Sequence, residues 1–158
     1  ALTAKVRAFG KRVVAPRAAI HDREATFPIE NFRDMHGEGL LRLCIPKDEG
    51  GLGADFQTYC LAAAELGRYC GATALSWNMH VCSTLWSGPL ADELEMTPAD
   101  RAAHRARRSV HYQRIVNDGA VYAQPFSEGG AAAAGATGRN HAWSWLVWPP
   151  ACGDWNVT

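Results

Sequence analysis

Apolar residues recur at helical spacing from the start of the chain. Leu2, Val6, Phe9 and Val13 are three or four positions apart, and polar residues separate them. This periodicity predicts an amphipathic helix with one buried face. Proline has no amide hydrogen to donate, so we expect Pro16 to kink or end this helix near residue 15.

A second helix and a loop follow. Ile29, Phe32 and Met35 form a short apolar stripe after Phe27-Pro28, and proline is favoured at the first position of a helix. Residues 45–55 contain one proline and three glycines. This composition predicts a loop whose backbone visits positive φ, because glycine adopts that conformation without strain.

Two further stripes predict the most buried helices of the fold. Their apolar residues repeat at intervals of three and four, which is typical of one buried helical face. The first stripe consists of Phe56, Tyr59, Cys60, Ala63 and Leu66, and the second of Leu75, Met79, Cys82 and Trp86.

The pattern then changes from helix to strand. Thr97-Pro98 is typical of a capping residue followed by a first-turn proline, and it predicts a helix that ends at about Asn117. Asp118-Gly119 is a turn dipeptide, and residues 120–126 favour a short strand. The fold class is therefore mainly α, with the first strand or strands of a β-domain after the helices.

Composition narrows the function classes. The 158 residues carry a formal net charge of zero, and no apolar run reaches the roughly 18 residues of a membrane span. We expect no membrane partner and a cytoplasmic location. Five arginines lie between Arg101 and Arg114, but an acidic run precedes them, so we interpret them as a solvated helix face and expect no nucleic acid partner. The five cysteines are scattered without a C-x-x-C pair, which predicts reduced side chains and no metal site.

His80 is a candidate general base, because histidine titrates near neutral pH. No nucleophile, carboxylate or metal-binding motif accompanies it in the sequence. A lone helical histidine is more often a packed residue with satisfied hydrogen bonds, and we interpret His80 in that way.

An ordered series of short motifs resembles the acyl-CoA dehydrogenases. The series covers residues from about 6 to 137, nearly the whole N-terminal helical domain of that family. It consists of His21-Asp22-Arg23-Glu24 before Phe27-Pro28, then Gly39-Leu40-Leu41, Ile45-Pro46 with Gly50-Gly51-Leu52-Gly53, Ala64-Glu65-Leu66, and Ser127-Glu128 within residues 122–130.

The resemblance implies a site and a reaction. In the family, the segment that resembles Phe126-Ser127-Glu128 enters the β-domain and contacts the flavin, so we expect FAD contacts from Gln124, Phe126 and Ser127. The family's flavin accepts a hydride from an acyl-CoA thioester and passes electrons to an electron-transfer flavoprotein. Its catalytic carboxylate lies on a C-terminal helical domain, so we name no catalytic residue here.

The last part of the chain departs from the family pattern. Gly129-Gly130 and four alanines stand where the family has a proline and a Gly-Ser pair, and Trp143, Trp145, Trp148 and Trp155 crowd the end. Tryptophan is encoded only by TGG, so reading one base later turns each into a glycine codon. The shifted frame permits the family's Gly-Trp and Gly-Thr-Ser pieces. We hypothesise that the sequence after about residue 137 is out of frame; an in-frame, functional tail is the alternative.

These inferences divide the chain into an N-terminal helical domain, residues 1–119, and the start of a truncated β-domain, residues 120–158. We expect a fragment of a flavin-dependent acyl-CoA dehydrogenase that is inactive alone and self-associates through exposed apolar surface. Two alternatives remain open: a fragment of a same-fold flavin-dependent monooxygenase, and a non-enzymatic helical interaction module.

Overall fold

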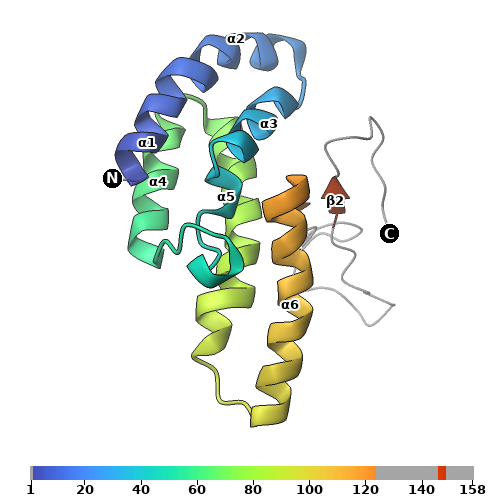
Figure 1. Cartoon of the computed structure of the whole chain (residues 1–158). Helices are drawn as coiled ribbons and strands as arrows, with labels where there is room; N and C mark the ends of the chain where they lie inside the picture. The colour runs from blue at the N-terminus through green and yellow to red at the C-terminus, as the bar shows by residue number, and fades with distance from the viewer. Residues whose placement is uncertain (1, 124–145, 149–158) are drawn as a thin grey trace, which may run out of the picture.

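The first helix continues through the predicted break. In the computed structural model, which describes residues 2–123 and 146–148, α1 (Leu2–Phe9) passes through a π-helical turn, η1 (Gly10–Val14), into α2 (Ala15–Glu24). Pro16 lies in the first turn of α2, where its missing amide costs little. The expected kink is present, since α1 and α2 run in different directions in Figure 1. Of the two predicted outcomes, a kink or an end, the kink is the one observed, because the helix continues from the π-turn into α2.

The glycine-rich loop directly follows a buried segment, and most of its own residues are exposed or partly buried. After α3 (Ile29–Gly37) come two 3-10 turns, η2 (Leu40–Arg42) and η3 (Lys47–Glu49). Gly50 and Gly53 have φ of 86° and 62°, as the composition predicts. A Cβ on Gly51 would lie 1.9 Å from the carbonyl oxygen of Ile45, so this position also requires glycine. The residues before the loop are fully or nearly fully buried: Leu40, Leu41, Leu43, Cys44 and Ile45.

Helices α4 (Phe56–Gly67) and α5 (Gly71–Leu85) form an antiparallel pair at the centre of the fold. The Asp55 carboxylate caps α4 by accepting the amide hydrogen of Thr58 at 2.8 Å. A π-helical turn, η4 (Trp86–Leu90), follows α5 and leads to α6 (Pro98–Asp118). Figure 1 shows α6 alongside α5.

The ends of α6 agree with the sequence. The Thr97 hydroxyl accepts the amide hydrogen of Asp100 at 3.1 Å, and Gly119 ends the helix with a φ of 68°. Strand β1 (Val121–Ala123) follows and pairs antiparallel with β2 (Leu146–Trp148), Tyr122 opposite Val147. The predicted mainly helical class, with a short sheet after the helices, is confirmed.

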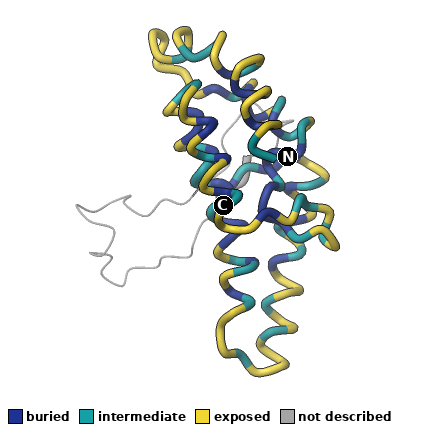
Figure 2. The backbone as a smooth tube through the Cα atoms, turned by 90° about the vertical axis from the view of Figure 1, so that its left-hand side faces the viewer, coloured by how far each residue is buried: buried dark blue, intermediate teal, exposed yellow. Residues whose placement is uncertain are grey.

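Buried positions follow the facing sides of the helices, and exposed positions cover their outer sides (Figure 2). Trp77 of α5 is the largest fully buried side chain among the described residues, and its indole donates a hydrogen bond to the Leu40 carbonyl at 3.1 Å. The core therefore lies where α5 meets the segment before the glycine-rich loop.

Candidate functional site

The candidate site begins where β1 leaves the helical core. The three predicted flavin contacts, Gln124, Phe126 and Ser127, follow β1 directly and lie outside the described residues. What the structure describes is the support of the strand that leads to them. That support comes from α5 on one side and α6 on the other.

His80 of α5 holds the backbone of β1. Its Nδ1 lies 3.0 Å from the amide nitrogen of Tyr122, and its Nε2 lies 2.9 Å from the carbonyl oxygen of Leu41. The ring is fully buried. Burial lowers its pKa to about 4, so the imidazole is neutral at physiological pH. The interpretation of His80 as a packed residue with satisfied hydrogen bonds is confirmed, and a general-base role does not fit these contacts.

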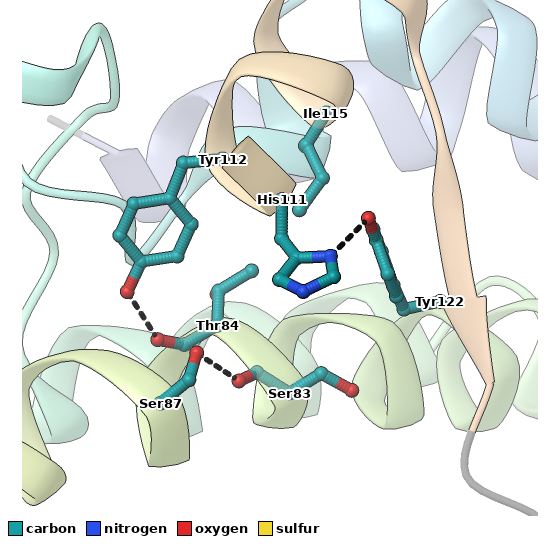
Figure 3. A pocket seen from close by; sticks show the side chains of 7 residues that line it. All are labelled: Ser83, Thr84, Ser87, His111, Tyr112, Ile115 and Tyr122. Carbon is teal, nitrogen blue, oxygen red and sulfur yellow. Dashed lines mark hydrogen bonds between the residues drawn. The ribbon is translucent and has the colours of Figure 1, made fainter. Parts of the chain in front are cut away.

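The side chain of Tyr122 is held by α6. Its hydroxyl lies 2.9 Å from Nδ1 of His111, and the two rings meet edge to face with centroids 5.4 Å apart (Figure 3). Burial lowers the pKa of His111, with a further contribution from Arg114, and burial raises the pKa of Tyr122. Both groups are therefore neutral at physiological pH, and Tyr122 is fixed through its backbone and its side chain.

A small apolar crevice lies beside this tyrosine. It is lined by Ser83, Thr84, Ser87, His111, Tyr112, Ile115 and Tyr122, as Figure 3 shows. The three hydroxyl groups of α5 and η4 each donate to a helix carbonyl three or four residues earlier. The volume is about 40 Å³, enough for only a few waters at roughly 10–15 Å³ each. The crevice is too small for a flavin or a thioester.

An apolar face of α5 lies next to this crevice and is open to solvent. Leu75 and Trp86 are 65% and 49% exposed, and Met79 and Cys82 between them are partly exposed. Sequence periodicity predicts burial of this stripe, and the structure shows that prediction to be wrong. Phe56 of α4, also predicted to be buried, is 58% exposed.

Arg105, Arg107 and Arg114 of α6 are exposed, as predicted for a solvated helix face, and two other arginines have structural contacts. Arg108 is buried, donates to the Asp92 carboxylate at 2.9 Å, and also donates to the carbonyl of Ser87. Arg101 donates to the carbonyls of Asp92 and Leu94. The prediction of a solvated arginine face is therefore wrong for these two side chains, which hold the corner between α5 and α6.

Within residues 2–123 and 146–148, no three His, Cys, Asp or Glu side chains come together as metal ligands. No helix of that same part of the chain is long and apolar enough to cross a membrane. Sequence reasoning missed the pairing of Tyr122 with His111, which carries no motif. The described residues form a helical bundle in which α5 and α6 hold the strand β1 that follows it.

Residues 1–90 match the profile of the family described as "Acyl-CoA dehydrogenase, N-terminal domain". This match covers more than half of the chain, and the chain belongs to the acyl-CoA dehydrogenase family.

Curated relatives agree with this assignment. The chain is 38% identical over 85 residues to a probable acyl-CoA dehydrogenase, YngJ, of Bacillus subtilis, covering 54% of this chain and 22% of the relative. It is 36% identical over 84 residues to the human mitochondrial short-chain specific acyl-CoA dehydrogenase, covering 53% and 20%. It is 37% identical over 75 residues to an NADH-dependent acryloyl-CoA reductase of Anaerotignum propionicum, covering 48% and 19%. The matched segment thus spans about a fifth of each relative.

Proposed function

We propose that this chain is the N-terminal helical domain, residues 1–119, and the start of the β-domain, residues 120–158, of a flavin-dependent acyl-CoA dehydrogenase. The main support for this proposal is the family match over residues 1–90, in a helical fold that continues into β1. In the whole protein, the substrate is an acyl-CoA thioester and the electron acceptor is an electron-transfer flavoprotein. We also propose a cytoplasmic location, although the human relative is named as mitochondrial.

The contribution of this chain to FAD binding is confined to the strand and the segment after it. Gln124, Phe126 and Ser127 follow β1, whose Tyr122 is held by His80 and His111. A Ser127 hydroxyl can donate to or accept from the polar edge of a flavin. The crevice of about 40 Å³ beside Tyr122 is too small for a flavin, so this crevice supplies none of the remaining contacts.

FAD, when bound, supplies the acceptor for a hydride from the β-carbon of the acyl group. The accompanying loss of the α-proton requires a buried carboxylate base, and we assign that role to no residue of this chain. Because the matched segment spans about a fifth of each relative, we expect the chain alone to be inactive towards acyl-CoA.

A flavin-dependent monooxygenase of the same fold is the second candidate. The observation that favours it is the Gly129-Gly130 and alanine run, which replaces the family's small-residue motif after Ser127. Such an enzyme consumes oxygen with reduced flavin, whereas a dehydrogenase transfers hydride from the thioester without oxygen. A non-enzymatic helical module is the third candidate and requires no flavin.

Titration of the purified chain with FAD, followed by flavin fluorescence, tests the proposal. We expect saturable binding that weakens about fivefold in Ser127→Ala, the effect of one lost hydrogen bond of about 1 kcal/mol. Ser109→Ala is the matched control, because that hydroxyl bonds Glu49 on another part of the fold. Absence of FAD binding, or an equal loss in both variants, would contradict the proposed flavin contact.

An anaerobic experiment separates the two enzymes. FAD bound to the chain together with the C-terminal domains of a related dehydrogenase should bleach on addition of an acyl-CoA. If the flavin is bleached only by a separate reductant, and the reduced protein consumes oxygen once air is readmitted, the monooxygenase would be favoured. The chain without those domains should bind flavin and leave it oxidised.

A further inference from the structure

β1 has few contacts of its own to fix its register. It pairs with β2 over only three residues, so its register depends on its contacts with the helices as well as on this short ladder. A slip by one residue would turn every side chain of the strand to the opposite face.

The ring of His80 supplies a register-specific contact. A carbonyl oxygen only accepts, so Nε2 must carry the hydrogen that is donated to Leu41. A backbone amide only donates, so Nδ1 must be free to accept from Tyr122. The two contacts together select one neutral tautomer. The fully buried side chain of His80 thereby joins Leu41, which precedes the glycine-rich loop, to Tyr122 of β1.

Side-chain contacts reinforce the same register. The rings of Tyr122 and His80 stack with centroids 6.4 Å apart and an interplanar angle of 22°. The Tyr122 hydroxyl bonds Nδ1 of His111 at 2.9 Å on the opposite side. A slipped strand would place Val121 or Ala123 at this point, and neither residue has a group that could reach His111.

We propose that His80 is a positioning residue, which fixes the register of β1 and thereby the orientation of the flavin-contact residues after it. This inference rests on the proposed function for its consequence in FAD binding, but not for its structural claim. His80 touches neither cofactor nor substrate, so it acts through Tyr122. The bond from the Tyr122 amide to His80 also makes the position of β1 dependent on α5.

Two amide substitutions separate the two hydrogen bonds of His80. In His80→Asn, the side-chain oxygen reaches the place of Nδ1 and still accepts from Tyr122, while the bond to Leu41 is lost. In His80→Gln, the side-chain nitrogen reaches the place of Nε2 and still donates to Leu41, while the strand bond is lost. Each variant loses one buried bond, so a purely structural role predicts similar effects of both.

The first measurement is hydrogen exchange at the Tyr122 amide in the full chain. We expect exchange at least about tenfold faster in His80→Gln than in His80→Asn, as loss of one hydrogen bond implies. The second measurement is FAD affinity, which we expect to fall about fivefold to tenfold more in His80→Gln. Equal exchange and equal affinity in the two variants would overturn the proposal.

Failure of the proposed FAD binding can be distinguished from failure of the proposed role of His80. If the unsubstituted chain binds no FAD, the proposed function fails, and Tyr122 exchange still decides whether His80 holds the strand. If both variants fail to fold, nitrogen NMR of the unsubstituted chain tests the role of His80 by determining which ring nitrogen carries the hydrogen. A protonated Nε2 with an unprotonated Nδ1 coupled to the Tyr122 amide supports the proposal, and the opposite tautomer overturns it.

Discussion

The two faces of helix α5 differ in a way that hydrophobicity alone does not explain. The face towards the core and β1 includes polar side chains, among them His80 and Thr84, and both are buried. The opposite face carries Leu75, Met79, Cys82 and Trp86, and its two largest members are half or more exposed. Burial on the first face is made possible by backbone partners for each polar group.

The comparison shows what each face does. A buried polar side chain with satisfied bonds fixes one arrangement of neighbouring segments, because any other arrangement leaves its bonds unmade. An exposed apolar stripe does not stabilise the domain itself, and stripes of this kind commonly mark surfaces of contact. We infer that one face of α5 holds the fold together and the other is available for association.

The largest expected difference between the faces is in stability. Trp77→Ala should lower the free energy of unfolding by about 3–5 kcal/mol, because it removes a fully buried indole and leaves a cavity. Trp86→Ala should lower it by less, because that side chain is 49% exposed and loses a smaller buried area. Urea unfolding followed by circular dichroism measures both. Equal losses in the two variants would show that the open face is covered in solution.

The next effect is a loss of stability in mild acid. His80 is neutral in the folded chain, where burial lowers its pKa to about 4, and an unfolded histidine protonates near 6.5. Between these values the unfolded chain binds one more proton, so stability falls as the pH falls through this window. The full difference is about 3 kcal/mol.

Urea unfolding at pH 7 and pH 4.5 checks this effect. His111, whose pKa is also lowered, adds a smaller change of the same sign. The carboxylates with lowered pKa, including Glu65 and Asp92, act mainly below pH 4.5 and therefore separate from the histidines. His80→Asn should have a flatter pH profile than the unsubstituted chain, and an unchanged profile would contradict the assignment to His80.

The sequence predicted the elements whose signals are local. The cap at Thr97 and the turn at Gly119 bound α6 within about a residue of the prediction, and Gly50 has the positive φ expected of it. Each of these features depends on neighbours within one turn of chain, so short motifs are sufficient. The π-turn before Pro16 has no such motif, so the sequence predicted a kink or an end there but not the π-turn that accompanies the kink.

The contacts around β1 were less predictable because their partners are distant. His80 bonds residues 39 and 42 positions away, and no periodic pattern encodes such a pairing. Periodicity did locate an apolar face on α5, but it contains no information about what covers that face. The flavin contacts at Gln124, Phe126 and Ser127 came from the family resemblance and remain predictions.

Charged substitutions on the open face of α5 should have the smallest effect on stability and a clear effect on self-association. Leu75→Lys combined with Trp86→Lys places two charges on the open face of α5, where water can solvate them, so the free energy of unfolding should change less than in Trp77→Ala. Self-association should weaken, because an apolar surface that associates loses its hydrophobic contribution when charged. Sedimentation velocity over a range of concentrations measures this. Val110→Lys is the matched control, since Val110 of α6 is 56% exposed and lies outside the stripe. If this control weakens association as much as the double variant, general charge repulsion rather than the α5 face explains the change.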